Sequence, residues 1–317
     1  MDKITFEFRK YNSATDRCIW DDFVTKSRNA TFLHLRGYMD YHSDRFDDAS
    51  LIALRNGKPI AMLPACRQPD GTLSSHAGLT YGSWLLPPAH LDGAAILRLI
   101  EQWVEYCSGR FSAIDYKPVP YIYHAMPSQE DMYALWRCGF TARSVNLSST
   151  IDLSYGCRFN MSKRQQLRKA EANDITIKRE TDFSAFWQIL ETCLQERHDT
   201  TPVHSLDEIS RLALAFPDNI KLYVLSDREG PQAGVCIYDT GRVAHSQYGA
   251  TTARAREKFY LTALYHHLIT EVFAHCKYFD FGISNERGGK VLNYGLLNQK
   301  YSMGATGVTY TTYHLKL

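Results

Sequence analysis

The sequence lacks the short motifs that mark several common enzyme classes. It contains no GxSxG nucleophile elbow, no GxxxxGK[ST] phosphate loop, no HExxH zinc motif and no dinucleotide-binding GxGxxG. These motifs supply, respectively, a serine nucleophile, a backbone cradle for nucleotide phosphates, paired zinc ligands and a turn that fits a pyrophosphate. Covalent serine hydrolysis, nucleotide hydrolysis, zinc proteolysis and NAD chemistry are therefore disfavoured.

Cysteine spacing gives no sign of a disulfide framework or a metal site. The eight cysteines are scattered, with no CxxC pair and no paired Cys/His spacing. Several have apolar neighbours, as in Gly234-Val235-Cys236-Ile237. Because free cysteine packs as a small apolar residue, we expect buried, reduced thiols and no bound metal.

The net charge is small, and the sequence has no long apolar run. The chain has 36 Lys and Arg against 34 Asp and Glu, a formal charge of +2, so any anionic partner must meet a local patch. No stretch approaches the roughly 18 apolar residues of a membrane span, and the first twelve residues hold no apolar leader core. We expect a cytoplasmic protein without a membrane span.

What the 317 residues do contain is an internal repeat of element order. Residues 51–66 predict a hairpin turning at Asn56-Gly57, and residues 220–238 predict another turning at Gly230-Pro231. Each is followed by a Tyr-Gly pair, an amphipathic helix (91–107 and 256–275) and a strand that carries Asp115 or Asp280. This order predicts a duplicated α/β unit. Further helices are expected at 15–28, 31–45, 130–137, 158–169, from 183 and at 290–302.

A basic segment lies where the two copies join. Arg158, Lys163, Arg164, Arg168 and Lys169 occur without an intervening acid, on a helix that we expect to begin at Asn160 or Ser162. Such a helix suits a phosphate group or an RNA end. A solvated helix face is the alternative.

Polar side chains gather at strand ends in the second copy. His245 ends a strand beside Gln247 and Tyr248, and an imidazole there can act as general base towards an amine. Lys300, on the helix after Gly288-Gly289, can neutralise an oxyanion or a phosphate. The alternative is that Lys300 lies on the solvent-exposed face of an ordinary amphipathic helix.

Two loops complete the candidate list. Residues 197–204 bring Arg197, His198 and His204 together, either as binding and proton-transfer groups or as a surface loop. The loop 116–124 is rich in tyrosine and proline and either stacks on sugar rings or packs internally. The candidate catalytic residues are His245, Lys300 and His204; the candidate substrate-binding residues are Arg197, His198, Gln247, Tyr248, Asp280, Ser284, Asn293, Lys117 and Tyr81.

Several segments resemble a known family. SKRQQLRKAEANDITIK, LYVLSDREGPQAGVCIY and KYFDFGISN…LNYGLLNQKYSMGA are similar to the second half of FemAB-like proteins, which contain two GNAT-type (acetyltransferase) folds. TFLHLRGYMDYH, LTYGSWLLPP and DYKPVPYIYHAMPSQEDMYAL resemble their amino-terminal unit. The resemblance implies an α/β protein with mixed sheets in two tandem GNAT-like domains. The amino-terminal domain (1–155) would form a structural or acceptor-side wall, and the carboxy-terminal domain (156–317) would be catalytic.

The same resemblance implies an N-acyltransferase. The donor would be acetyl-CoA or another acyl-CoA, or alternatively aminoacyl-tRNA, and the acceptor the amine of a small molecule or glycan precursor in bacterial polysaccharide or cell-wall biosynthesis. Lys300 would lie near the reacting acyl group, and Asp280 and Ser284 at the mouth of the second-domain cleft. Arg164, Arg168 and Lys169 would lie beside a groove between the domains. A non-catalytic carbohydrate- or nucleotide-binding protein on the same scaffold is the third alternative.

One segment departs from the family pattern. GNAT enzymes hold the CoA pyrophosphate with a Q/R-x-x-G-x-G/A turn before a helix, whereas residues 250–256 here read ATTARAR. Arg254, Arg256 and the helix start are the candidate phosphate-binding groups in its place. No coiled-coil insertion of the kind used by some tRNA-dependent members is visible.

Overall fold

The computed structural model describes residues 4–89, 91–198 and 200–317, with the side chains of Arg197 and His198 outside the description. The chain forms two compact units. Unit 1 comprises Met1–Asn146, Arg287–Lys290 and Thr309–Leu317, and unit 2 comprises Leu147–Glu286 and Val291–Val308. The expected domain border at residue 155 stays a prediction about how the two homologous halves divide.

Unit 1 holds two sheets. One has the strand order β1-β3-β4, and the other β2-β5-β6-β7-β16-β8, to which β8 contributes its first residues. The strands are β1 (Glu7–Lys10), β2 (Asp47–Asp48), β3 (Leu51–Arg55), β4 (Lys58–Leu63), β5 (Cys66–Arg67), β6 (Thr72–Ser74), β7 (Ala113–Tyr116), β8 (Thr141–Asp152) and β16 (Thr306–Lys316). The helices are α1 (Arg17–Lys26), α2 (Arg36–Met39), α3 (Gly93–Cys107) and α4 (Glu130–Arg137).

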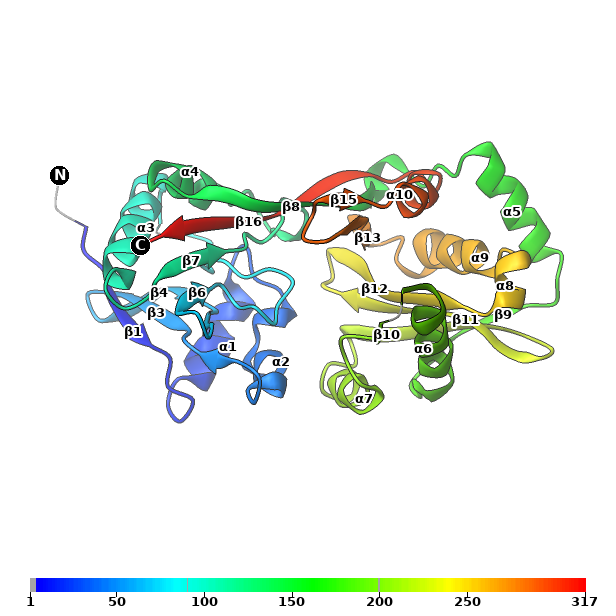
Figure 1. Ribbon diagram of the computed structural model, residues 1–317, viewed down its shortest axis with the longest axis horizontal. Helices are drawn as coiled ribbons and strands as arrows, with labels where there is room; N and C mark the ends of the chain where they lie inside the picture. Colours follow the sequence, from blue (N-terminus) through cyan, green and yellow to red (C-terminus); the bar gives the residue numbers. More distant parts are fainter. Residues whose placement is uncertain (1–3, 90, 199) are drawn as a thin grey trace. The chain divides into compact units, whose positions relative to one another are not determined.

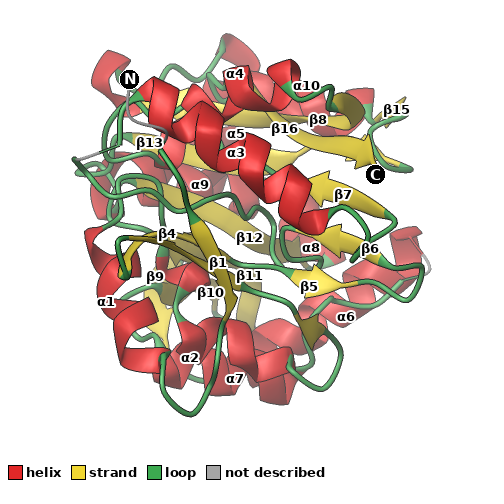
Figure 2. Cartoon of the chain, turned by 90° about the vertical axis from the view of Figure 1, so that its left-hand side faces the viewer, coloured by secondary structure: helices red, strands yellow, loops and turns green. Residues whose placement is uncertain are grey.

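Helix α3 forms the centre of the unit 1 core. Asp92 accepts a hydrogen bond from the Ala95 N–H at 2.8 Å and so caps the helix, and the apolar face includes Trp103 and Cys107, which are fully buried. Ile114 of β7 belongs to the same core cluster. Figure 2 shows α3 running across this unit. The helix expected at 91–107 and the Asn56-Gly57 hairpin are both confirmed, and both turn residues have positive φ, 53° and 71°.

The single helix expected over residues 31–45 is wrong. The segment forms a 3-10 turn (Phe32–His34), the one-turn α2 and a second 3-10 turn (Asp40–His42). The break falls at Leu35, which has extended backbone, with ψ at 141°. His34 Nδ1 accepts the Thr31 N–H at 3.0 Å, and this local bond caps the start of the first turn.

Unit 2 is a sheet with helices on both faces. Its strand order is β8-β13-β12-β11-β10-β9, and α6 and α7 cover one face while α5, α8 and α9 cover the other (Figure 1). The strands are β9 (Thr176–Glu180), β10 (Ile220–Asp227), β11 (Gly230–Asp239), β12 (Val243–Thr251) and β13 (Tyr278–Ile283), with a short hairpin of β14 (Asn285–Glu286) and β15 (Val291–Leu292). The helices are α5 (Met161–Glu171), α6 (Ser184–His198), α7 (Leu206–Ala215), α8 (Ala253–Glu257), α9 (Tyr260–His267), a π-helical turn (Leu268–Val272) and α10 (Tyr294–Tyr301).

The helix expected at 256–275 is broken. Phe259 adopts left-handed backbone with φ at 59° and separates α8 from α9. Thr252 caps α8 by accepting the Ala255 N–H at 3.1 Å, so this helix begins earlier than expected. The hairpin turn expected at Gly230-Pro231 is also displaced, because both residues already lie in β11.

The two units share one pairing pattern. Strands β6 and β7 are parallel with Ser74 opposite Asp115, and strands β12 and β13 are parallel with His245 opposite Asp280. The matched position of the two aspartates is what the sequence repeat predicted. Among the described residues, no helix is long and apolar enough to cross a bilayer.

Candidate functional site

The candidate site lies where two parallel strands part. β12 and β13 pair only from Val243 to His245 and from Tyr278 to Asp280. Beyond that point β12 bulges, because Cys236 and Ile237 of β11 face Tyr248 and Ser246 and leave Gln247 as the extra residue. Ligands of open α/β sheets bind beyond the carboxyl ends of strands, where neighbouring strands diverge. Gln247, a candidate substrate-binding residue, is thus also the residue that bends the strand.

A histidine–carboxylate pair sits at this point. His245 Nδ1 lies 2.7 Å from Asp280 Oδ2, while Ser148 and Thr150 donate to Asp280 Oδ1 at 2.6 and 2.7 Å. Asp280 is fully buried, whereas 14% of the His245 side chain is exposed. The carboxylate therefore fixes a ring whose other edge can meet solvent or substrate.

The environment of Asp280 keeps it ionised. Burial raises the pKa of this carboxyl, but the hydrogen bonds from His245, Ser148 and Thr150 outweigh burial and lower the pKa to about 2. A carboxylate that stays charged holds the Nδ1 proton of a neutral imidazole. Nε2 is then the basic nitrogen.

Lys300 contacts the end of β13. Its Nζ donates to the Gly282 and Ile283 carbonyls at 2.8 and 2.7 Å, which fastens α10 to the end of β13. Burial lowers the pKa of this ammonium to about 8, and the Asp280 charge opposes the shift. Gly282 has φ at 76°, and a Cβ on it would lie 3.4 Å from His245 Cε1. Asp280, His245 and Lys300 thus share one neighbourhood.

Ser284 and Asn293 have different positions. The Ser284 hydroxyl is buried and has no hydrogen-bond partner in the described part of the chain. Asn293 caps α10 by accepting the Leu296 N–H at 3.0 Å, and its amide donates to Glu286 at 3.0 Å. The side chain of Asn293 therefore has a structural role, and its substrate-binding role stays a prediction.

Tyr248 and His204 meet on the α6 side of the sheet. The Tyr248 hydroxyl lies 2.6 Å from His204 Nδ1, and its ring packs edge-on against Trp187 with centroids 5.2 Å apart. His204 is buried. Trp187 was not among the sequence candidates, since an aromatic residue on an amphipathic helix gives no signal beyond core packing. Arg197 and His198, also candidates, have side chains outside the described residues.

The candidate phosphate groups divide into two sets. Arg254 contacts Asp227 at 3.4 Å and is also paired with Glu229, so two carboxylates already compensate its charge. Arg256 is exposed on α8. A cavity of about 240 Å³ lies between α6 and the start of α8, and Glu196 brings a negative charge to it.

The basic helix α5 is confirmed, with Asn160 as its cap: the Asn160 side chain accepts the Lys163 N–H at 2.9 Å. Arg164, Arg168 and Lys169 are exposed, and Lys169 lies over the Phe259 ring at 5.8 Å. This part of unit 2 is an exposed cationic surface.

Tyr81 and Lys117 lie inside unit 1. The Tyr81 hydroxyl donates to Thr31 at 3.3 Å, and its ring packs against Tyr123. Lys117 donates to the Leu79 carbonyl, and burial lowers the pKa of its ammonium to about 8. Both residues make internal contacts, and their substrate-binding roles stay predictions. In the described residues there is no group of three or more His, Cys, Asp or Glu side chains arranged to hold a metal ion.

Comparison with known proteins identifies a domain and the fold. Residues 159–289 match the family model described as an acetyltransferase (GNAT) domain, and the chain as a whole has the α/β fold of tandem GNAT proteins. The predicted resemblance to FemAB-like proteins of the GNAT superfamily is confirmed at the level of fold and domain.

Three solved structures are similar over nearly the whole chain. FemX has a TM-score of 0.68 at 12% identity, covering 98% of this chain and 97% of its own. L-PGS from Bacillus licheniformis has a TM-score of 0.60 at 12% identity, covering 96% and 93%. A tandem GNAT protein from the clavulanic acid biosynthesis pathway, solved without AcCoA, has a TM-score of 0.52 at 9% identity, covering 98% of each chain. No curated protein matches the sequence. At these identities the likeness concerns the fold.

Proposed function

We propose that this protein is an N-acyltransferase that moves an acyl or aminoacyl group onto an amine, with the reaction in unit 2. The observation that carries the proposal is the 2.7 Å contact between His245 Nδ1 and the buried, charged Asp280, where β12 and β13 part. An imidazole held in this way offers Nε2 as a base.

The proposed step is aminolysis of an activated acyl group. The amine nitrogen attacks the acyl carbon, His245 Nε2 takes the proton from that nitrogen, and the imidazolium then gives it to the departing CoA sulfur or tRNA ribose oxygen. Asp280 stabilises the imidazolium that forms, because its own pKa stays low. Holding donor and acceptor together supplies the larger part of the acceleration, up to roughly 7–11 kcal/mol.

Two buried polar groups in unit 2 are an argument that a substrate binds there. The hydroxyl of Ser284 and the indole N–H of Trp187 are buried and have no hydrogen-bond partner within the described ranges. Buried polar groups are normally satisfied, so a substrate atom would complete each of them. An ammonium has three N–H groups, and Lys300 uses two on backbone carbonyls. The third is its means of reaching an oxyanion.

Two versions of the proposal differ in the acyl donor. The turn before α8 has no glycine after Gly249, and Arg254 is already paired with acids, so the segment offers little to a CoA pyrophosphate. The exposed residues Arg164, Arg168 and Lys169 favour a polyanionic donor such as aminoacyl-tRNA. Acetyl-CoA or another acyl-CoA is the first version and aminoacyl-tRNA the second; the acceptor in both is an amine of a small molecule or glycan precursor.

The test compares donors and a matched pair of variants. Wild-type protein is incubated with labelled acetyl-CoA or with labelled aminoacyl-tRNA and a panel of amino sugars and diamines, and label transfer is measured. His245→Gln should abolish transfer, whereas His267→Gln should not, although His267 also contacts a carboxylate, Glu271, at 3.1 Å. If neither donor binds or is consumed by the wild type, the proposal is wrong.

A further inference from the structure

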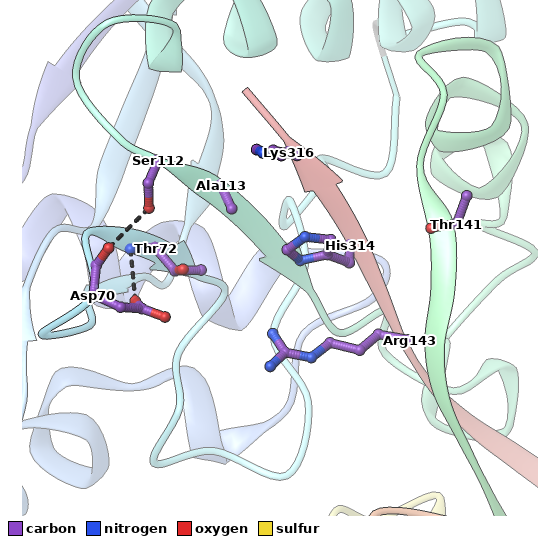
Figure 3. A pocket seen from close by; sticks show the side chains of 8 residues that line it. All are labelled: Asp70, Thr72, Ser112, Ala113, Thr141, Arg143, His314 and Lys316. Carbon is purple, nitrogen blue, oxygen red and sulfur yellow. Dashed lines mark hydrogen bonds between the residues drawn. The ribbon is translucent and has the colours of Figure 1, made fainter.

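Unit 1 has its own polar pocket. A cavity of about 520 Å³ opens on one face of the sheet formed by β6, β7, β16 and β8 (Figure 3). Thr72, Ala113, His314, Lys316 and Arg143 reach it, because alternate residues of a strand share one face. The intervening residues Leu73, Ile114 and Leu315 belong to the core cluster with α3. Small-molecule sites are typically of this volume.

An oriented histidine lies in this pocket. Asp115 accepts from His314 Nδ1 at 2.7 Å through one oxygen and from Arg143 at 2.6 Å through the other. The arrangement matches that of His245 and Asp280 in unit 2, with the same contact distance.

The strand register shows how the two copies differ. Asp280 lies between His245 on its parallel neighbour and Thr150 on its antiparallel neighbour. Asp115 lies between Ser74 on its parallel neighbour and His314 on its antiparallel neighbour. The histidine and the hydroxyl residue have thus exchanged strands, and unit 1 retains a fixed imidazole on its exposed sheet face.

The charges of the pocket are opposite on its two sides. Arg143 forms an ion pair with Asp115 at 2.6 Å, and the Arg143 charge also acts on Asp70. Asp70 comes from the turn before β6, where one carboxylate oxygen accepts the Thr72 N–H at 2.9 Å and the other faces the pocket (Figure 3). Lys316 comes from β16, on the other side of β7. Asp70, in the turn before β6, and Lys316, on β16, therefore come from opposite sides of β7.

The spacing of these charges suits a small zwitterion. Two strand spacings separate β6 from β16, roughly 10 Å. In a free α-amino acid the ammonium and a carboxylate oxygen are roughly 3 Å apart. With one charge-assisted hydrogen bond of about 2.8 Å at each end, the amino acid would span most of the distance between β6 and β16. The hydroxyls of Ser112 and Thr141 add partners around the ligand.

We propose that this pocket binds a free α-amino acid, with its ammonium on Asp70 and its carboxylate on Lys316. Asp70 would repel an isolated anion, and Lys316 would repel an isolated amine. Either half of the amino acid should therefore bind less well than the whole amino acid. The proposal does not rest on the function of unit 2.

The test uses L-alanine with its two halves, propionate and ethylamine, and calorimetric titration of the full-length protein. L-alanine should bind about tenfold more tightly than either half, and both Asp70→Asn and Lys316→Met should weaken its binding about tenfold. Lys58→Met, an exposed lysine on β4, is the control and should bind L-alanine as the wild type does. Equal binding of the three probes, or wild-type affinity in either pocket variant, would overturn the proposal.

Discussion

Replacing Asp280 with asparagine separates the structural role of this residue from its role in the site. The pKa of the carboxyl lies at about 2 against 3.8 in an unperturbed aspartate, a difference that corresponds to about 2 kcal/mol of stability. Because the folded-state pKa is the lower one, this stabilisation is complete above about pH 4 and is lost as pH falls through 2. We therefore expect Asp280→Asn to lower the free energy of unfolding by about 2 kcal/mol at neutral pH, with a gap to wild type that narrows towards pH 2.

The same substitution should invert the histidine tautomer. An asparagine oxygen can still accept from Ser148 and Thr150, but its amide then presents N–H groups to His245 Nδ1. The imidazole responds by placing its proton on Nε2, where it can no longer accept one from an amine. Loss of a positioned general base costs about 100- to 10,000-fold in rate.

Urea denaturation between pH 7 and pH 2.5 measures the stability change, and nitrogen NMR of labelled histidine measures the tautomer. Asp239→Asn is the control, since Asp239 is also buried in unit 2 and paired with Lys221 at 2.7 Å. It should lose stability but keep transfer activity. Unchanged transfer in Asp280→Asn, or a His245 that keeps its proton on Nδ1, would refute the reasoning.

Three further predictions follow from individual contacts. Gly282→Ala and Gly241→Ala, at φ 76° and 80°, should each cost about 1 kcal/mol of stability, but only the former, whose Cβ meets His245, should lose transfer activity. Lys169→Ala should weaken tRNA binding and flatten its salt dependence in filter-binding assays, whereas Arg211→Ala on α7 should do neither. Burial lowers the pKa of His34 from 6.5 to about 4, so wild type should lose about 3 kcal/mol of unfolding free energy as pH falls from 6.5 to 4. This loss should be absent in His34→Gln, as denaturant titrations at several pH values would show; an equal slope in the variant would contradict it.

Much of the fold could be predicted from short sequence patterns. Asn56-Gly57 specifies its hairpin turn, the apolar spacing specifies α3, and Asn160 specifies the start of α5. The break at Phe259 could not be foreseen, because a non-glycine residue in left-handed backbone is imposed by packing and gives no sequence signal.

The candidate site was predictable residue by residue but not as a constellation. His245 and Asp280 were selected as strand-end residues, which is wrong, because each is the third residue of its strand. Their contact depends on the parallel register of β12 and β13. Ser148 and Thr150 were missed because their strand lies about 130 residues away in sequence. His314 was missed for the same reason: only the pairing of β16 with β7 brings it to Asp115. Long-range strand pairing is the information that a single sequence does not display.

In the proposed reaction His245, held by Asp280, accepts the proton of an attacking amine. The most direct test is the pH dependence of amine-dependent label transfer by wild type, His245→Gln and His267→Gln, with whichever donor the wild type consumes. We predict that wild type and His267→Gln share one rate and one pH profile, and that His245→Gln is slower by at least about 100-fold and has a different pH profile. Transfer by His245→Gln at the wild-type rate and with the wild-type pH profile would contradict the claim.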